Sequence, residues 1–226
     1  MSTASVPGRI YLADQRGLTQ TAQQQRYSTF NFGSYAAEGR EPFGALLACN
    51  EELLAPGQTV ALPAPAVSSY LLLLPVTGAV EVADASADVG QVLVLPVPAG
   101  APVELRNPYP DATIALLHLW VAAAEGVVPA AAWVLDYDPA TLDNQLAPLL
   151  PADAGPPVAL YLGRFQGRHE VVVRPAGERL FALVLAGAFE FEGRLLHAHD
   201  GLALWDCPAA EVEALSNDAL VLVVEL

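Results

Sequence analysis

Short apolar and polar runs alternate along this chain, and turn residues separate them about every ten residues. Ile10-Tyr11-Leu12 predicts a first short strand. Residues 27–32 alternate aromatic with polar side chains, as a half-buried strand does, and residues 44–49 predict another strand. This spacing is typical of a β-sandwich or barrel rather than of alternating helices and strands.

The most apolar stretch lies between residues 55 and 82. It predicts a Pro56-Gly57 turn, a buried strand over residues 70–74, a turn at Gly78 and an alternating strand after it. Residues 91–95 predict a further strand closed by Pro96, and residues 112–121 predict a long buried one. The first half of the chain is therefore predicted to be all-β.

The second half repeats the first. Residues 76–82 return as residues 185–191, residues 90–94 as 201–205, and residues 112–120 as 218–226. The spacing from Gly78 to Gly187 nearly equals that from Gly90 to Gly201, so one register relates all three landmarks. Such a repeat indicates tandem copies of one small β-domain.

Residues 129–157 form the natural linker because their composition shifts to Ala, Asp and Pro. Residues 130–135 and 141–146 are candidates for short helices, limited by Pro139 and Pro148. We therefore expect an N-terminal barrel over residues 1–128, a partly helical linker over 129–157 and a C-terminal barrel over 158–226.

Composition excludes several function classes. The net charge is −15, and all ten basic residues are arginines, which argues against a nucleic-acid partner and excludes lysine Schiff-base or P-loop chemistry. No apolar run approaches the ~18 residues of a membrane helix. The polar start lacks the features of a signal peptide, so a cytoplasmic location is the expectation. Cys49 and Cys207 lie far apart and predict ordinary buried thiols.

Taken together, the two halves resemble the pirin family of bicupins over nearly the whole length. The resemblance is carried by short motifs in a consistent order: Ile10-Tyr11-Leu12 with Arg16-Gly17, residues 29–35, Arg106-Asn107-Pro108, Leu119-Trp120, Glu125-Gly126-Val127 ahead of Pro129, and residues 200–206. The resemblance implies an all-β fold of two tandem cupin (jelly-roll-like) β-barrels, with an iron-type metal in the first. Some family members use that metal to oxidise quercetin, and others regulate protein partners.

The family holds its metal with a His-x-His pair, a later His and a Glu. The resemblance maps the pair to Ala64 and Ala66, the later His to Val103 and the Glu to Leu105. Glu104 is one residue out of register, and one step along a strand turns a side chain to the other face. Imidazole and carboxylate suit Fe(II), whereas methyl groups bind no metal. We therefore expect no metal and no cofactor there, and no catalytic residues.

Histidines elsewhere offer alternatives. His118 is expected to be satisfied by hydrogen bonds within a buried strand rather than to act as a ligand. His197 and His199 share one face if their segment is extended, and with Asp200 and His169-Glu170 they could form a different metal site. The simpler interpretation of residues 196–201 is a polar hairpin end entering a glycine turn.

Three hypotheses follow. The favoured one is a pirin-like bicupin without metal that serves as a non-catalytic binding or regulatory protein. Its first barrel would be either packed shut or open to an apolar small molecule at Ala64, Ala66, Val103 and Leu105. The alternative is a quercetinase-like metal-dependent dioxygenase that uses non-family ligands such as His197 and His199. A third is a structural role in an oligomer. The sequence leaves the ligand, any protein partner and the oligomeric state open.

Overall fold

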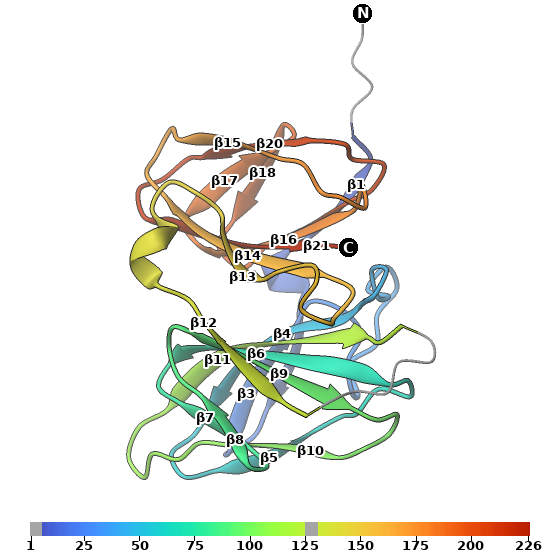
Figure 1. The fold of residues 1–226 in the computed structure, drawn as a ribbon, viewed down its shortest axis with the longest axis vertical. Coiled ribbons are helices and arrows are strands. Elements are labelled where there is room, and N and C mark those ends of the chain that lie inside the picture. The colour runs from blue at the N-terminus through green and yellow to red at the C-terminus, as the bar shows by residue number, and fades with distance from the viewer. Residues whose placement is uncertain (1–5, 125–130) are drawn as a thin grey trace, which may run out of the picture. The chain divides into compact units, whose positions relative to one another are not determined.

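The computed structural model describes residues 6–124 and 131–226, whose regular structure is almost entirely β (Figure 1). The chain divides into two compact units. One contains residues Arg16–Tyr137 with Gly155–Pro157 and is called the first barrel. The other contains Met1–Gln15, Asp138–Ala154 and Val158–Leu226 and is called the second barrel. No helix in the described residues is long and apolar enough to cross a membrane.

The first barrel consists of a seven-stranded and a four-stranded antiparallel sheet, in the orders β12-β9-β6-β11-β4-β3-β2 and β5-β10-β7-β8. Its strands are β2 (Gly17–Gln20), β3 (Gln24–Ser28), β4 (Leu46–Leu54), β5 (Thr59–Leu62), β6 (Ser69–Thr77), β7 (Val80–Val82), β8 (Ala85–Ala87), β9 (Gln91–Val97), β10 (Val103–Arg106), β11 (Ile114–Ala122) and β12 (Trp133–Asp136).

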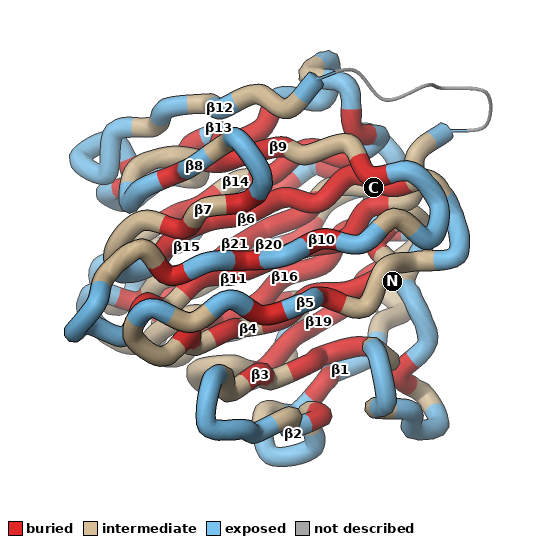
Figure 2. Tube along the Cα trace, turned by 90° about the horizontal axis from the view of Figure 1, so that it is seen from below, coloured by how far each residue is buried: buried red, intermediate tan, exposed pale blue. Residues whose placement is uncertain are grey.

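Strands β6 and β11 form the centre of the larger sheet, and both are buried along most of their length (Figure 2). Alternate residues of a strand point to the same face. Leu71 and Leu73 of β6 and Leu116 and Trp120 of β11 accordingly belong to one apolar core inside the barrel. After β6 the chain turns at Gly78, which has φ +69°, a conformation that favours glycine.

The second barrel repeats this plan, with sheets in the orders β1-β19-β16-β21-β14-β13 and β15-β20-β17-β18. Its strands are β1 (Gly8–Tyr11), β13 (Ala147–Leu150), β14 (Ala159–Phe165), β15 (Glu170–Val173), β16 (Leu180–Ala186), β17 (Ala188–Phe191), β18 (Arg194–His197), β19 (Gly201–Leu204), β20 (Ala210–Ala214) and β21 (Ala219–Glu225).

The predicted internal repeat appears in the sheet orders. Strands β9, β6, β11 and β4 follow one another in the first barrel as β19, β16, β21 and β14 do in the second. In each barrel one further strand closes the edge beside β9 or β19. That strand is β12 in the first barrel and β1 in the second.

These edge strands differ from the expected domain boundaries. β1, expected within an N-terminal barrel of residues 1–128, pairs with β19 through Ile10↔Leu202, so residues 6–15 group with the second barrel. Within the expected linker, residues 133–136 form strand β12 rather than a helix because their backbone pairs antiparallel with β9. The one helical turn there is η2 (Pro139–Leu142), which begins at proline and is capped by Asp138.

Two other expectations need comment. Strand β3 ends at Ser28, so most of the aromatic-rich run over residues 27–32 lies in the following loop. The chain leaves the sheet there because Phe32 pairs with Tyr35 across a tight turn. Residues 125–130, which include the Glu125-Gly126-Val127 motif and the start of the linker, lie outside the described residues.

Candidate functional site

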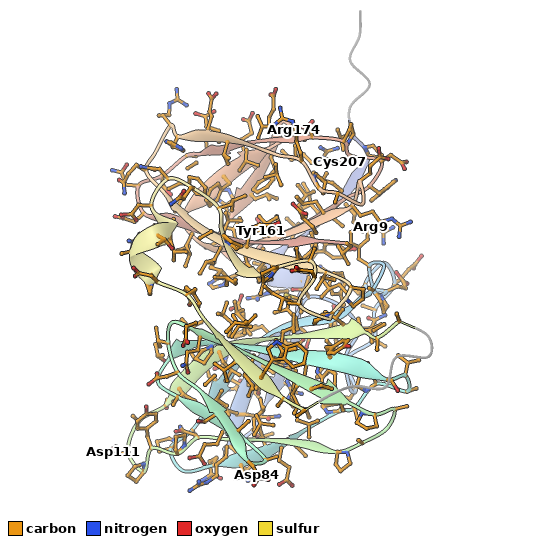
Figure 3. All side chains as sticks on the ribbon, viewed as in Figure 1. Arg9, Asp84, Asp111, Tyr161, Arg174 and Cys207 are labelled. Carbon is orange, nitrogen blue, oxygen red and sulfur yellow. The ribbon has the colours of Figure 1, made fainter. Side chains whose placement is uncertain are left out.

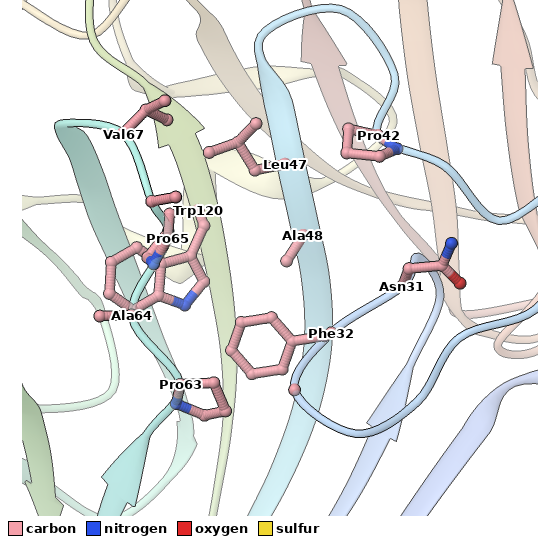
Figure 4. Close-up of a pocket in the computed structure, with 12 residues that line it drawn as sticks. Asn31, Phe32, Pro42, Leu47, Ala48, Pro63, Ala64, Pro65, Val67 and Trp120 are labelled. Atoms are coloured by element: carbon pink, nitrogen blue, oxygen red, sulfur yellow. The ribbon is translucent and has the colours of Figure 1, made fainter. Parts of the chain in front are cut away.

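A pocket of about 300 Å³ opens in the first barrel (Figure 4). Four segments build its walls: the loop after β3, the start of β4, the segment between β5 and β6, and the end of β11. Its lining residues are Asn31, Phe32, Gly33, Pro42, Leu47, Ala48, Pro63, Ala64, Pro65, Ala66, Val67 and Trp120. Nearly all of these are apolar, which suits an apolar ligand.

The loop that carries Phe32 is held in place by its own backbone. Phe32 and Tyr35 exchange two main-chain hydrogen bonds of 3.0 and 3.1 Å, and the Asn31 side chain accepts one of 2.8 Å from the Ala37 amide. Gly33 has φ +60°, and a Cβ on it would lie 2.9 Å from Pro63 Cγ. Glycine therefore lets this loop approach the Pro63 segment and narrow the pocket.

The structure brings two of the four predicted positions to this pocket. Ala64 and Ala66 line it. Val103 and Leu105 do not, because they lie on β10 opposite Leu62 and Val60 and are buried in the apolar core. The positions to which the resemblance assigns metal ligands thus carry only methyl and larger aliphatic groups. They do not fit a metal ion.

No alternative cluster of donors replaces them in the described parts of the chain. Among residues 6–124 and 131–226, no group of three or more His, Cys, Asp or Glu side chains is arranged to hold a metal ion. In the second barrel, the sequence suggests a metal site that includes Asp200 and His169, but both side chains have other contacts. Asp200 is buried, and its carboxylate accepts hydrogen bonds from the backbone amides of Ala13 (2.8 Å) and His197 (2.9 Å). His169 instead stacks its ring on Phe165, with 5.6 Å between ring centroids.

The cysteines are ordinary buried thiols, as predicted. Burial, reinforced by the nearby charge of Glu51, raises the pKa of the Cys49 thiol to about 12. Burial also raises the pKa of Cys207, which lies in the second barrel (Figure 3) and whose Sγ lies 3.3 Å from the Ala209 carbonyl. Neither thiol has the lowered pKa of a nucleophile.

A charged network is buried inside the first barrel, on strands β3, β4 and β11. Arg26 Nε on β3 donates to Glu52 Oε2 on β4 at 2.5 Å, and His118 Nε2 on β11 lies 3.2 Å from the same oxygen. All three residues are at most 4% exposed. Phe32 covers the network, with its ring centroid 5.2 Å from the Arg26 guanidinium carbon and 5.7 Å from that of the His118 ring.

The tautomer of His118 follows from this network. Burial lowers the pKa of His118, an effect opposed by its hydrogen bond to Glu52, so the ring is neutral at pH 7. A neutral imidazole carries one N–H, and a carboxylate only accepts, so Nε2 bears the proton. Nδ1 is then a bare acceptor, and it has no hydrogen-bond partner. The prediction of a satisfied buried histidine is therefore confirmed for one nitrogen only.

Sequence reasoning missed Arg26, Asn50 and Glu52. Residues 50–52, Asn-Glu-Glu, precede Pro56-Gly57 and have the composition of a turn. In the structure they continue β4, and Asn50 and Glu52 point inward with Ala48 and Leu54. The period-two alternation with Ala48 and Leu54 was the available signal.

Comparisons with known proteins agree with this architecture. Residues 157–226 match the family model described as the quercetinase C-terminal cupin domain. No curated protein matches the chain.

Solved structures match over almost the whole chain. YhhW from Escherichia coli has a TM-score of 0.85 at 21% identity, covering 97% of each chain. The bacterial pirin YhhW in complex with nickel(II) gives 0.83 at 21% identity, covering 97% of this chain and 99% of that one. Quercetin 2,3-dioxygenase from Acinetobacter baumannii gives 0.68 at 16% identity, covering 96% and 84%.

Proposed function

Starting from the premise that the chain is a pirin-like cupin of two barrels, we propose that it is a non-catalytic binding protein. Its first barrel takes up a small apolar molecule at the pocket beside Ala64 and Ala66, and it does so without a metal ion. The molecule's presence is then read out by a regulatory partner rather than by a chemical step.

One observation carries the proposal: methyl, proline and aromatic carbons bound the pocket, and they include two of the four positions to which the resemblance assigns metal ligands, Ala64 and Ala66. Its volume of about 300 Å³ is at the lower end of the range for small-molecule sites, which suits a ligand of about one aromatic ring. Alanine and proline side chains gain contact area with such a ligand and have no rotamer entropy to lose.

A metal-dependent dioxygenase is the second candidate. It is favoured by the quercetinase domain match over residues 157–226 and by the fold shared with a quercetin dioxygenase. This candidate requires a metal held by residues outside the family positions, His197 and His199 among them.

Metal content and ligand binding together test the two candidates. Untagged protein purified without chelators is analysed by elemental mass spectrometry, before and after incubation with Fe(II) or Ni(II), and oxygen uptake with quercetin is recorded. We expect far less than one metal per chain and no uptake. One tightly held metal per chain that is lost in His199→Ala would overturn the proposal in favour of the dioxygenase.

Toluene is the probe for the pocket itself. Ala64→Leu fills part of the pocket and leaves less room for the probe. It is expected to weaken toluene binding roughly tenfold, which corresponds to a loss of about 1.4 kcal/mol of binding free energy. Ala61→Leu is the matched control, because Ala61 is exposed on β5. Calorimetry that detects no toluene binding in the parent protein would show that this pocket does not take up apolar molecules.

A further inference from the structure

The inner face of the first barrel holds an unusual concentration of unpartnered polar atoms. Asn50 Nδ2 and Oδ1, Glu52 Oε1, His118 Nδ1 and Trp120 Nε1 are all buried and have no hydrogen-bond partner among the described residues. Each of these four residues is at most 1% exposed. Buried polar groups are nearly always hydrogen-bonded, so a cluster of exceptions points to a missing partner.

These atoms share one region of the sheet. In the register of β11 with β4, Trp120 lies opposite Ala48 and His118 lies opposite Asn50. Alternate residues share a face, so Asn50 and Glu52 lie beside Trp120 and His118 on the inner face. Ser28 and Arg26 of β3 continue the same row opposite Asn50 and Glu52. We call this set of Asn50, Glu52, His118 and Trp120 the polar recess.

The polar recess adjoins the pocket. Trp120 belongs to both, since it lines the pocket and supplies an unpartnered N–H. Figure 4 shows its indole nitrogen on the edge turned toward Phe32. Ala48 lines the pocket two residues before Asn50 on the same strand face, and Phe32 separates the pocket from His118. Of the four recess residues, Trp120 is the one that lines the pocket, so it is the residue that a molecule in the pocket contacts.

The charges of the recess define which chemical group fits. Arg26 and Glu52 neutralise each other, and His118 is neutral, so no excess charge is available for an ion. Donors come from Trp120 and from the Asn50 amide, and acceptors from the Asn50 carbonyl, His118 Nδ1 and Glu52 Oε1. A group that both donates and accepts, a hydroxyl, satisfies this mixture. A carboxylate would be buried without a counter-charge.

We propose that the polar recess is the specificity element of the pocket, and that it selects neutral molecules with an apolar body and one hydroxyl group over their hydrocarbon and carboxylate analogues. This inference rests on the proposed binding function and names the chemistry of its ligand. The hydroxyl accepts from Trp120 Nε1 and exchanges hydrogen bonds with the Asn50 carboxamide.

Three probes of similar shape test it: toluene, benzyl alcohol and benzoate, each titrated by calorimetry. The parent protein is expected to bind benzyl alcohol at least as tightly as toluene, and benzoate at least tenfold more weakly than either. If toluene binds and benzyl alcohol binds roughly tenfold more weakly, the specificity proposal fails while the binding function stands. If no probe binds, the binding function itself fails.

Two variants locate the effect, and the affinity ratio of benzyl alcohol to toluene is the readout, because it cancels general changes in the pocket. Asn50→Leu and Trp120→Phe are each expected to lower that ratio roughly tenfold, since each removes a partner of the buried hydroxyl. Trp205→Phe removes an indole from the second barrel and is expected to leave the ratio unchanged. An unchanged ratio in both recess variants would overturn the proposal.

A measurement on the parent protein guards against variants that fail to fold. The chain has three tryptophans, so its indole N–H signals in a ¹⁵N correlation spectrum can be assigned with Trp133→Phe and Trp205→Phe. The Trp120 signal is expected to move with benzyl alcohol in a way that toluene does not reproduce. Identical shifts with both probes would overturn the proposal, because the hydroxyl would then make no hydrogen bond to the Trp120 indole N–H.

Discussion

The two barrels are copies of one plan with different interiors. Of the ten buried polar or charged residues in the described chain, nine lie in the first barrel. They are Arg26, Ser28, Thr29, Arg40, Asn50, Glu52, Ser69, Asn107 and His118. The second barrel contributes only Asp200, whose carboxylate accepts hydrogen bonds from two backbone amides. The first barrel thus buries many more polar side chains than the second does.

Corresponding strands show how the second interior is filled. His118 of β11 lies between Asn50 and Leu73, whereas Val223 of β21 lies between Tyr161 and Ala182. Tyr161, labelled in Figure 3, packs against the apolar core there. At Gly163 an added Cβ would lie 2.6 Å from the Phe165 ring, so that ring occupies the space of the missing side chain. Aromatic side chains thus fill the second interior, whereas the same region of the first interior holds the polar side chains of Asn50 and His118.

The largest expected effect comes from breaking the buried ion pair. Arg26→Met leaves the Glu52 carboxylate buried without its cation and is expected to lower the free energy of unfolding by about 3–5 kcal/mol. The double variant Arg26→Met/Glu52→Leu should recover much of that loss. Urea unfolding followed by circular dichroism measures both.

Arg164→Met is the matched control in the second barrel. Its pair with Asp143 is exposed, with side chains 41% and 61% accessible, and such pairs contribute about 0–1 kcal/mol. If Arg26→Met and Arg164→Met lowered the free energy of unfolding equally, the distinction between a polar first interior and an apolar second one would be contradicted.

A comparison of two phenylalanines sharpens the contrast in packing. Phe165→Ala opens a cavity in a filled interior and is expected to lower the free energy of unfolding by about 3–5 kcal/mol. Phe32→Ala should cost less, about 1–2 kcal/mol, because its ring is half-buried and already faces the pocket. Thermal and urea unfolding give both values. A greater loss in Phe32→Ala would mean that the pocket is filled in solution.

The smallest effect is a pH dependence confined to the first barrel. Burial holds the pKa of His118 below its ordinary value of 6.5, so below pH 6.5 the unfolded chain binds a proton that the folded chain does not. Stability therefore falls as the pH falls through this range, by at most about 1.4 kcal/mol per pH unit. His118→Gln should reduce the loss of stability between pH 7.5 and 5.5. Parallel pH profiles for the two proteins would show that the hydrogen bond and charge of Glu52 offset the effect of burial on the pKa of His118.

Hydrophobic patterning predicted most of the strands and the internal repeat, because burial on one face leaves a period of two in the sequence. It did not predict the partner of β1, since pairing over such a distance leaves no local pattern. It also missed the polar recess. Asn50 and Glu52 look like turn residues until β3 and β11 lie on either side of them, so the recess is a property of three strands together.

The position of β1 has a consequence for how the protein is made. Its strand partner is β19, and the Ala13 amide that follows β1 is hydrogen-bonded to Asp200, 187 residues later. During synthesis β1 must therefore wait, unpaired, until β19 has emerged from the ribosome. At a rate of about 5–20 residues per second, that wait is on the order of ten seconds or more. Over that interval the edge of β1 that pairs with β19 stays open.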